Sequence, residues 1–362
     1  MGESNEATGG GARRHGFGIV GAGVIGATHA EAIAMIPSAR LAAVADLNPG
    51  RARELAGKHG CEHADSLDAL LARPDVDVVS VCVPSGLHAE AGIRAATAGK
   101  HLVIEKPIDV TLQAADRLIA AARAAGVAMT VISQHRFDPG PAELRRLLDA
   151  GALGSLVLGE ASTKWYRTQG YYDSAAWRGT PDLDGGSLMN QGIHYVDLLL
   201  WALGPATEVT AVCVTRAHQI EVEDTALAIV RFSSGAVGSI ASSTAVFPGS
   251  PQRLELHGTT GTVVIEDGRL VLRALSGEDP GGPGRAPDPP APAAAANAAA
   301  IDPAGHAAQI GDLLAAIDVG RPPAVTAEDA RATLEVVCAV YQSQRSGRTI
   351  TIPVRPDPQA GP

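Results

Sequence analysis

Aromatic residues, cysteines and cations are all scarce in this chain, and the cysteines and the charge balance each argue against a class of protein. Phe, Trp and Tyr make up 3% of the 362 residues. The 4 cysteines show neither CxxC nor zinc-finger spacing, which predicts free thiols in a reducing compartment. Lys and Arg number 29 against 39 Asp and Glu, so the net charge is −10 and a nucleic-acid groove is not expected.

Long apolar runs are also missing. No stretch approaches the roughly 20 residues that a transmembrane helix needs. Residues 1–15 are polar and glycine-rich, with no apolar signal-peptide core, and are predicted to form a disordered tail. We therefore expect a cytoplasmic protein with no membrane or nucleic-acid partner. Its length suits two domains.

Strand and helix patterns alternate from residue 16 to about residue 135. The β-branched run 76–83 is typical of a strand buried on both faces. Repeated β-α-β units predict an α/β fold with an N-terminal Rossmann domain and a doubly wound parallel sheet. Strands are expected at 17–20, 41–45, 76–83, 101–104 and 127–132, and helices at 25–36, 49–58, 87–98 and 112–125.

A glycine-rich turn of the form GxGxxG joins the first strand to the first helix. In such a turn the first glycine permits the tight bend, the second lets the backbone approach a pyrophosphate, and the third lets the helix pack on the strand. The N–H groups at the start of the helix then face the phosphates. The predicted dinucleotide cradle is Gly21, Gly23, Val24, Ile25 and Gly26.

Asp46 ends the second apolar run, at the place where a carboxylate binds the adenosine ribose. A carboxylate there repels a 2′-phosphate, and residues 47–50 bring no cation beside it. NAD is therefore the expected cofactor, with NADP less favoured. Asp46 could also cap the helix at 49–58, and the two roles are compatible.

After residue 150 the pattern changes to closely spaced strands separated by Gly, Ser and Asp turns. Strands are expected at 156–161, 225–232, 236–242, 253–257, 262–266 and 349–352, and helices at 193–203, 307–319 and 327–345. This pattern predicts an antiparallel sheet in an α+β domain. A Pro/Ala-rich surface loop is expected at 277–303. We assign 16–135 to NAD binding and 136–355 to substrate binding and oligomerisation.

Several short motifs follow one another in a fixed order along the chain. They are Gly21-x-Gly23-x-x-Gly26, Asp46, Val83-Pro84-x-x-x-His88, Glu105-Lys106-Pro107, Arg136-Phe137, Trp177-Arg178, Gly185-Gly186-Ser187, Gly192-x-His194-x-x-Asp197 and Tyr341-x-Ser343-x-x-x-Gly347. The series resembles the glucose-fructose oxidoreductase / inositol 2-dehydrogenase (Gfo/Idh/MocA) family from Gly16 to Pro353. The resemblance implies a Rossmann domain followed by a C-terminal domain with an open, mostly antiparallel sheet. We also expect a homodimer or homotetramer.

The resemblance implies that Lys106 and His194 move the proton of a substrate hydroxyl. A lysine amine that is out of water and near a cationic cofactor should have a lowered pKa, which suits this role. Asn190 departs from the aspartate of many family members. It cannot ionise, but it can still orient a hydroxyl or Lys106. Asp197 either orients His194 or makes helix and loop contacts, and we count Asn190 and Asp197 as candidate substrate-binding residues.

The resemblance also extends the cofactor site beyond the glycine cradle and Asp46. Trp177 and Arg178 resemble a pair that packs on the nicotinamide and pyrophosphate, although they could instead be a packing tryptophan beside a surface arginine. The added candidates are Val83, Pro84, His88, Glu105, Lys106, Gln134, Trp177 and Arg178. No metal site is predicted.

Cations and aromatic residues gather between residues 164 and 172 of this aromatic-poor chain. Sugar rings stack on aromatic faces, and arginine holds carboxylates or phosphates. Tyr166, Arg167 and Tyr172 are therefore predicted to contact substrate. The alternative is a domain edge that packs in an oligomer.

Together these features predict an NAD-dependent oxidoreductase that acts on a secondary alcohol of a sugar, cyclitol or sugar derivative, including nucleotide-linked and 3-keto sugars. One alternative is an NAD-retaining, glycoside-cleaving enzyme of the same fold. A second is a sugar- or dinucleotide-sensing regulator without catalysis, against which the retained Lys106 and His194 argue.

Overall fold

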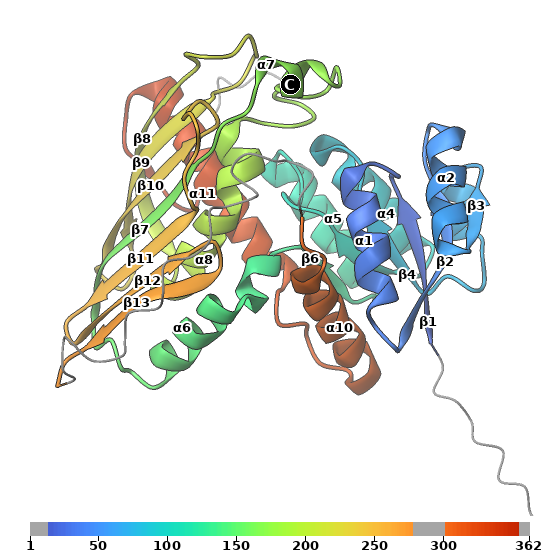
Figure 1. Cartoon of the computed structure of the whole chain (residues 1–362), viewed down its shortest axis with the longest axis horizontal. Coiled ribbons are helices and arrows are strands. Elements are labelled where there is room, and N and C mark those ends of the chain that lie inside the picture. The colour runs from blue at the N-terminus through green and yellow to red at the C-terminus, as the bar shows by residue number, and fades with distance from the viewer. Residues whose placement is uncertain (1–13, 278–300, 355–362) are drawn as a thin grey trace, which may run out of the picture.

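The computed structural model describes residues 14–277 and 301–354. The predicted tail thus lies outside the described residues except at its end, where His15 already begins the first strand. Residues 278–300 of the predicted Pro/Ala-rich loop also lie outside them. The chain folds into two layered parts, a smaller parallel sheet and a larger mixed sheet, with helices packed between them (Figure 1).

The N-terminal part is a parallel six-stranded sheet in the order β3-β2-β1-β4-β5-β6. This is the Rossmann strand order, which confirms the predicted fold class. The short β3 and α3 were not expected. The strands are β1 (His15–Val20), β2 (Ala39–Ala45), β3 (Glu62–Ala64), β4 (Val78–Val81), β5 (His101–Ile104) and β6 (Met129–Val131), and the helices are α1 (Val24–Ala34), α2 (Pro49–His59), α3 (Leu67–Leu71), η1 (Ser85–Leu87), α4 (His88–Thr97), α5 (Leu112–Ala125) and η2 (Gln134–Phe137).

Alternation along the parallel strands divides their side chains between two apolar layers. Phe17 and Ile19 of β1 pack in one cluster with α1 and α2, while Val20 belongs to the other, with α4 and α5. Successive side chains of a strand point to opposite faces, so a strand that is buried on both faces needs a continuous apolar run. This is why these strands could be predicted from their runs.

The C-terminal part is an eight-stranded sheet in the order β13-β12-β11-β7-β10-β9-β8-β14. All neighbours pair antiparallel except β10 with β7, so the sheet is mostly antiparallel, as predicted. β8, β13 and α6 were not expected. Its elements are α6 (Pro139–Asp149), β7 (Leu156–Lys164), α7 (Gln169–Asp173), the π-helical turn η3 (Leu188–Gly192), α8 (Ile193–Leu203), β8 (Ala206–Val214), β9 (Thr225–Phe232), β10 (Val237–Ser243), β11 (Arg253–Gly258), β12 (Gly261–Glu266), β13 (Arg269–Leu275), α10 (Ala304–Val319), α11 (Ala327–Ser346) and β14 (Ile350–Thr351).

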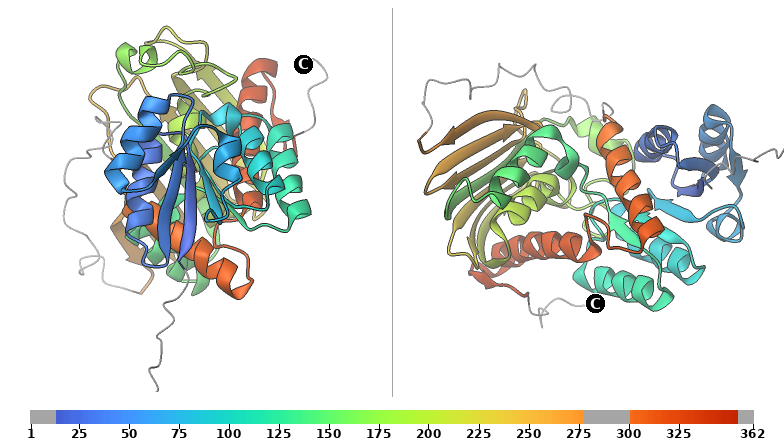
Figure 2. Two further views of the ribbon diagram at one scale, coloured as in Figure 1. Left: turned by 90° about the vertical axis from the view of Figure 1, so that its right-hand side faces the viewer. Right: turned by 90° about the horizontal axis from the view of Figure 1, so that it is seen from below.

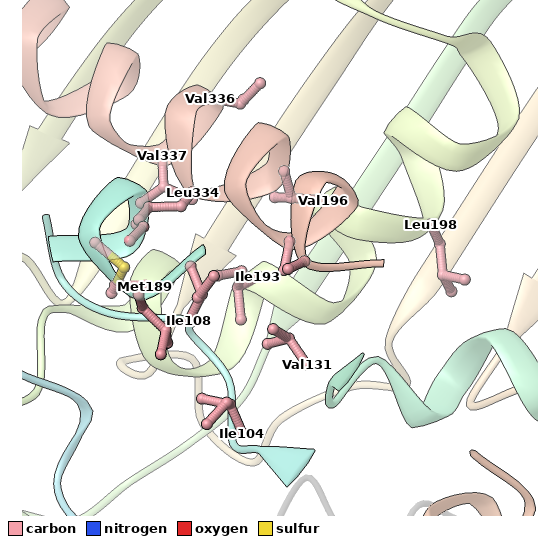
Figure 3. Packing of buried hydrophobic residues seen from close by; sticks show 14 of the residues in the cluster. Ile104, Ile108, Val131, Met189, Ile193, Val196, Leu198, Leu334, Val336 and Val337 are labelled. Carbon is pink, nitrogen blue, oxygen red and sulfur yellow. The ribbon is translucent and has the colours of Figure 1, made fainter. Parts of the chain in front are cut away.

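Two late helices connect the parts. α10 follows the large sheet in sequence, yet its Ile310, Leu313 and Leu314 pack in the cluster of β1 and α1, and Figures 1 and 2 show it beside the Rossmann sheet. α11 contributes Leu334 and Val337 to a cluster shared by both parts. Figure 3 shows both side chains in the cluster that also contains Met189 and Ile108. The Rossmann sheet is therefore completed by a helix from beyond residue 136.

Candidate active site

The glycine cradle has the geometry that the motif predicts. Gly21 has φ +97°, and an added Cβ would lie 2.3 Å from the Cys82 carbonyl oxygen. A Cβ on Gly26 would lie 2.0 Å from the Gly21 oxygen, so only glycine allows α1 to pack this closely. A Cβ on Gly23 would meet nothing within 4 Å. The space above Gly23, where Val24 and Ile25 begin α1, is therefore open to a ligand.

Asp46 lies beside the cradle at the carboxyl end of β2. Its carboxylate accepts hydrogen bonds from the backbone N–H groups of Ala22 and Asn48, both at 2.7 Å. The side chain of Asn48, not that of Asp46, caps α2, so the helix-capping alternative for Asp46 is wrong. Leu47 is fully exposed and adds no cation. Asp46 therefore retains the position expected of a ribose-binding carboxylate.

His88 is buried, and both of its ring nitrogens are engaged with backbone carbonyl groups of the chain. It is 1% exposed. Its Nδ1 lies 2.6 Å from the Pro107 carbonyl oxygen and its Nε2 lies 2.9 Å from that of Val83. Burial lowers the pKa of His88, and the two carbonyl oxygens act in the opposite direction. His88 thus ties the Val83-Pro84 turn to the turn that carries Lys106.

Glu105 is likewise buried beneath the site instead of lining it. Its Oε1 accepts a hydrogen bond from His29 Nε2 at 2.9 Å and lies 3.4 Å from His306 Nε2. Its Oε2 accepts the backbone N–H of Lys106 at 3.0 Å. Despite burial, the two imidazoles hold the pKa of Glu105 well below its usual value. This network joins α1, β5 and α10, and it holds the backbone from which Lys106 projects.

Lys106 reaches across to the second part of the chain. Its Nζ donates to the Asn190 carbonyl oxygen at 2.7 Å and lies 3.4 Å from Asn190 Oδ1. Burial lowers the pKa of Lys106, and the nearby Arg178 guanidinium acts in the same direction. The direction agrees with the expectation from sequence. A lysine with a lowered pKa gives up its proton more readily than a lysine in water, which suits acid/base chemistry.

Asn190 lies in the π-helical turn η3, a distortion that often occurs at functional sites. Its Nδ2 donates a hydrogen bond to Asp184 Oδ1. Asp184 is 1% exposed and also accepts the N–H of Gly179 at 2.8 Å. Asp184 was not among the predicted residues, although it directly precedes the Gly185-Gly186-Ser187 motif. Asn190 thus lies between a buried carboxylate and the lysine amine.

His194 lies on the first turn of α8 and lines the same small hollow as Lys106, between β6 and α11. Its ring makes an edge contact with that of His135, with 5.0 Å between centroids. Burial lowers the pKa of His194 well below its usual value, and the Lys106 amine and His135 reinforce the shift. The imidazole is therefore neutral at neutral pH and available as a proton acceptor.

Asp197 lines the same hollow as Lys106 and His194, but its carboxylate is held by other residues of the chain. Its two carboxylate oxygens accept from Arg136 Nε and Nη2, both at 2.7 Å. Thr333 Oγ1 donates to the same carboxylate at 3.2 Å. This buried pair joins η2, α8 and α11. Asp197 therefore positions α8, on which His194 lies.

The aromatic and cationic segment brings Tyr171, not Tyr172, to the site. The Tyr172 hydroxyl is buried against Thr244 Oγ1 at 2.7 Å, so its prediction as a substrate contact is wrong. Tyr171 stacks on two guanidinium groups, with the Arg178 carbon 4.3 Å and the Arg167 carbon 5.6 Å from its ring centre. Tyr166 lies farther out, with its ring 5.2 Å from that of Phe247.

Trp177, Arg178 and Gln134 lie where an interdomain cofactor could meet them. The Arg178 guanidinium stacks on Trp177 at 4.5 Å, and the loop that follows packs on Gly86 beside the Val83-Pro84 turn. Gln134 follows β6 at the carboxyl edge of the sheet. Gln134 Oε1 and Arg178 Nε are buried polar atoms without a hydrogen-bond partner among the described residues. Such orphaned atoms fit a ligand that supplies a donor and an acceptor.

Comparison with known families matches both parts of the chain. Residues 15–133 match the oxidoreductase family with an NAD-binding Rossmann fold, and residues 142–264 match the GFO/IDH/MocA C-terminal domain. The inositol 2-dehydrogenase of Rhizobium meliloti (strain 1021) is 32% identical over 265 residues, which cover 70% of this chain and 76% of the relative. The chain therefore belongs to the GFO/IDH/MocA oxidoreductase family, as the motif series indicates.

Solved structures and further relatives agree. The chain superposes with a TM-score of 0.86 on the WlbA dehydrogenase from Bordetella pertussis, crystallised with NADH and UDP-GlcNAcA; the two are 30% identical, and the match covers 95% of this chain and 99% of that one. A levoglucosan dehydrogenase from Pseudarthrobacter phenanthrenivorans (strain DSM 18606 / JCM 16027 / LMG 23796 / Sphe3) is 27% identical over 282 residues, covering 68% of this chain and 72% of the relative. These proteins share the predicted fold, cofactor and reaction type.

Proposed function

We propose that this member of the GFO/IDH/MocA family uses NAD to oxidise or reduce one secondary alcohol of a carbohydrate, with Lys106 and His194 moving the hydroxyl proton. The observation that carries the proposal is the convergence of two buried bases with lowered pKa values, from different parts of the chain, at the carboxyl edge of a dinucleotide-binding sheet. Ligands bind at this edge in open α/β sheets.

The residues present fit the cofactor. Gly23 leaves its cradle open, Asp46 lies beside it, and Arg178 and Gln134 offer unpartnered atoms across the cleft. We assign Gly21, Gly23, Val24, Ile25, Gly26, Asp46, Val83, Pro84, Gln134, Trp177 and Arg178 to holding NAD. Bound NAD supplies the hydride acceptor for oxidation and the donor for reduction.

The chain's own contribution is proton transfer and orientation. In the oxidation direction a neutral Lys106 amine or His194 imidazole accepts the hydroxyl proton, and burial makes the neutral form of each group easier to reach. Asn190 holds the amine through its two oxygens. In the reduction direction the protonated form of the same group returns the proton to the nascent alkoxide.

For the substrate, we propose a carbohydrate with an anionic group. The half-buried Arg178 stacks on Tyr171, which gives one wall a guanidinium group beside an aromatic face, and the buried Arg167 packs on the same ring. Guanidinium groups recognise carboxylates and phosphates, and aromatic faces suit sugar rings. Tyr166, at the outer end of this wall, is a candidate contact for a longer substituent. The WlbA dehydrogenase, which was crystallised with UDP-GlcNAcA, makes an anionic nucleotide sugar a reasonable first probe.

The test is a panel of UDP-GlcNAcA, myo-inositol, scyllo-inositol and levoglucosan with NAD⁺ or NADP⁺, followed by NADH absorbance. We expect turnover with NAD⁺, fastest with the anionic sugar, and a loss of about 100-fold or more in Lys106→Met. Release of an aglycone without net NADH would indicate the glycoside-cleaving alternative. NADH binding without turnover of any sugar would indicate a sensor.

We also propose that the chain acts as a homo-oligomer in the cytoplasm. The outer face of the large sheet exposes five apolar side chains on the adjacent strands β8, β9 and β10, namely Val212, Val214, Leu227, Ile229 and Val237. A contiguous apolar patch of this kind favours association with a second copy. All four cysteines are free, as a reducing compartment requires. None of the helices that the structure describes is long and apolar enough to cross a membrane.

Light scattering tests the oligomer. We expect at least a dimer, with Leu227→Glu/Ile229→Lys shifting it toward monomer. A monomeric wild type would refute this part of the proposal.

A further inference from the structure

The neutral Asn190 has a charged neighbour on the side away from Lys106. Asp184 Oδ1 accepts the Asn190 amide, and Asp184 Oδ2 accepts the Gly179 N–H. Burial raises the pKa of this carboxyl group, while its hydrogen bonds from Gly179 and Asn190 and the nearby cations of Arg178 and Lys106 favour the ionised form. A buried carboxylate that is fully bonded in this way acts as a fixed anchor.

The anchor determines which way the Asn190 amide points. An ionised carboxylate only accepts hydrogen bonds, so it must face the NH₂ group of the amide. The amide oxygen is then left facing the Lys106 ammonium, which only donates. With an ionised carboxylate and a protonated amine, the order carboxylate, amide, amine is thus the one arrangement in which each of these contacts has a donor and an acceptor.

We propose that Asp184 is a positioning residue of the reaction centre, which fixes Asn190 and through it the amine of Lys106. The role of Asp184 in catalysis rests on the proposed function. Its effect on the position and pKa of Lys106 does not, and can be measured without a substrate. An aspartate at position 190 would place a negative charge next to Lys106. Here the negative charge belongs to Asp184, and the neutral Asn190 side chain lies between it and the lysine. Lys106 then keeps an oriented acceptor while it remains easier to deprotonate.

Several charged groups near Lys106 influence its pKa, and an experiment must distinguish the effect of Asp184 from theirs. Glu105 lies on the same turn, Asp184 and Arg178 lie on the loop before η3, and His194 lies on α8. Asp184 itself faces Lys106, Arg178 and the phenols of Tyr171 and Tyr172. Of the groups named in this paragraph, Asp184 is the carboxylate that is hydrogen-bonded to Asn190.

Two variants test the arrangement. Asp184→Asn removes the charge and leaves two amides in contact, one of which lacks a proper partner. The swap Asp184→Asn/Asn190→Asp restores every hydrogen bond: the new amide accepts from Gly179 and donates to the new carboxylate, which accepts from Lys106. Asp182→Asn, which removes an exposed carboxylate from the same loop, is the matched control.

The readout is the pKa of the Lys106 amine in the protein without substrate. Competitive acetylation with acetic anhydride across pH, followed by mass spectrometry, gives this pKa, with Lys58, Lys100 and Lys164 as internal references. We expect Asp184→Asn to lower it by about one unit and the swap to raise it above the wild-type value. Asp182→Asn should leave it unchanged.

Activity provides the second readout, with the sugar that the panel identifies. The acidic limb of the kcat/KM profile for oxidation should move to lower pH in Asp184→Asn and to higher pH in the swap, with the swap regaining most of the lost kcat. An unchanged Lys106 pKa in both variants would overturn the proposal, and so would a swap that stays at the Asp184→Asn value. If no sugar reacts, the labelling result still decides the role of Asp184.

Discussion

Gly23 and Gly26 lie three residues apart, and adding a methyl group at each should have opposite consequences. Gly23 has φ −82° and ψ −165°, which alanine adopts freely, and its Cβ would contact nothing within 4 Å. In Gly26→Ala the Cβ would lie 2.0 Å from the Gly21 oxygen, so the start of α1 must move by about 1 Å or more.

The magnitudes follow from these contacts. Overpacking of this severity costs about 3 kcal/mol or more, so Gly26→Ala should unfold at markedly lower urea concentration. Gly23→Ala should change the free energy of unfolding by less than about 1 kcal/mol, because reduced flexibility of the unfolded chain offsets a weaker N-cap. Its methyl group occupies the space that the motif leaves for a pyrophosphate, so NADH affinity should fall about tenfold or more.

Urea unfolding and NADH titration by calorimetry measure the two effects separately. Gly57→Ala is the control, since Gly57 is within α2 and also has nothing within 4 Å of its added Cβ. It should leave the NADH affinity unchanged and stabilise the protein by up to about 1 kcal/mol, because alanine favours a helix interior more than glycine does. Undiminished NADH affinity in Gly23→Ala would refute the placement of the cofactor at this cradle.

Three further perturbations test other parts of the account. Asp46→Ser/Leu47→Arg removes the ribose-binding carboxylate and puts a cation at a fully exposed position; we expect the NADP⁺ to NAD⁺ ratio of kcat/KM to rise about 100-fold, and an unchanged ratio would contradict the role of Asp46. Burial raises the pKa of Glu223 to about 7, so the folded state holds a proton that the unfolded state loses between about pH 4.5 and 7. Stability should therefore fall across that window by at most about 3 kcal/mol, and Glu223→Gln should remove this component from urea unfolding measured at pH 5 and pH 8; an equal slope in both proteins would count against it. Asp197→Ala leaves Arg136 without its buried bidentate partner and should cost about 3 kcal/mol or more in urea unfolding, whereas a loss below about 1 kcal/mol would show that the pair does not hold α8.

The sequence patterns predicted best those helices and strands that bury one or both of their faces. β5, α5, α8 and β9 begin and end at the predicted residues, because their apolar periodicity or runs stop abruptly. β8 was missed because its outward Val212 and Val214 are apolar, so the strand lacks the alternation that marks a half-buried strand. The docking of α10 on the Rossmann sheet could not be predicted either, because an apolar helix face does not specify its partner.

The sequence likewise located some residues of the site and not others. Residues fixed by backbone chemistry, such as Gly21, Gly26 and Asp46, are where the motif places them. Composition does not place a side chain in this way: the sequence of the Tyr171-Tyr172 pair does not specify which ring is buried against Thr244. Asp184 was missed because its role depends on contacts across a loop and a π-helical turn, and neither leaves a periodic signal in the sequence.

The central claim is that hydride moves directly between nicotinamide and a carbinol carbon while Lys106 handles the proton. The most direct measurement uses the sugar selected by the panel, deuterated at the carbon that is oxidised, with NAD⁺ and wild-type protein, and analyses the product NADH by mass spectrometry. The account predicts NADH that carries one deuterium, and turnover reduced about 100-fold or more in Lys106→Met. Unlabelled NADH, or full turnover without the lysine, would contradict it.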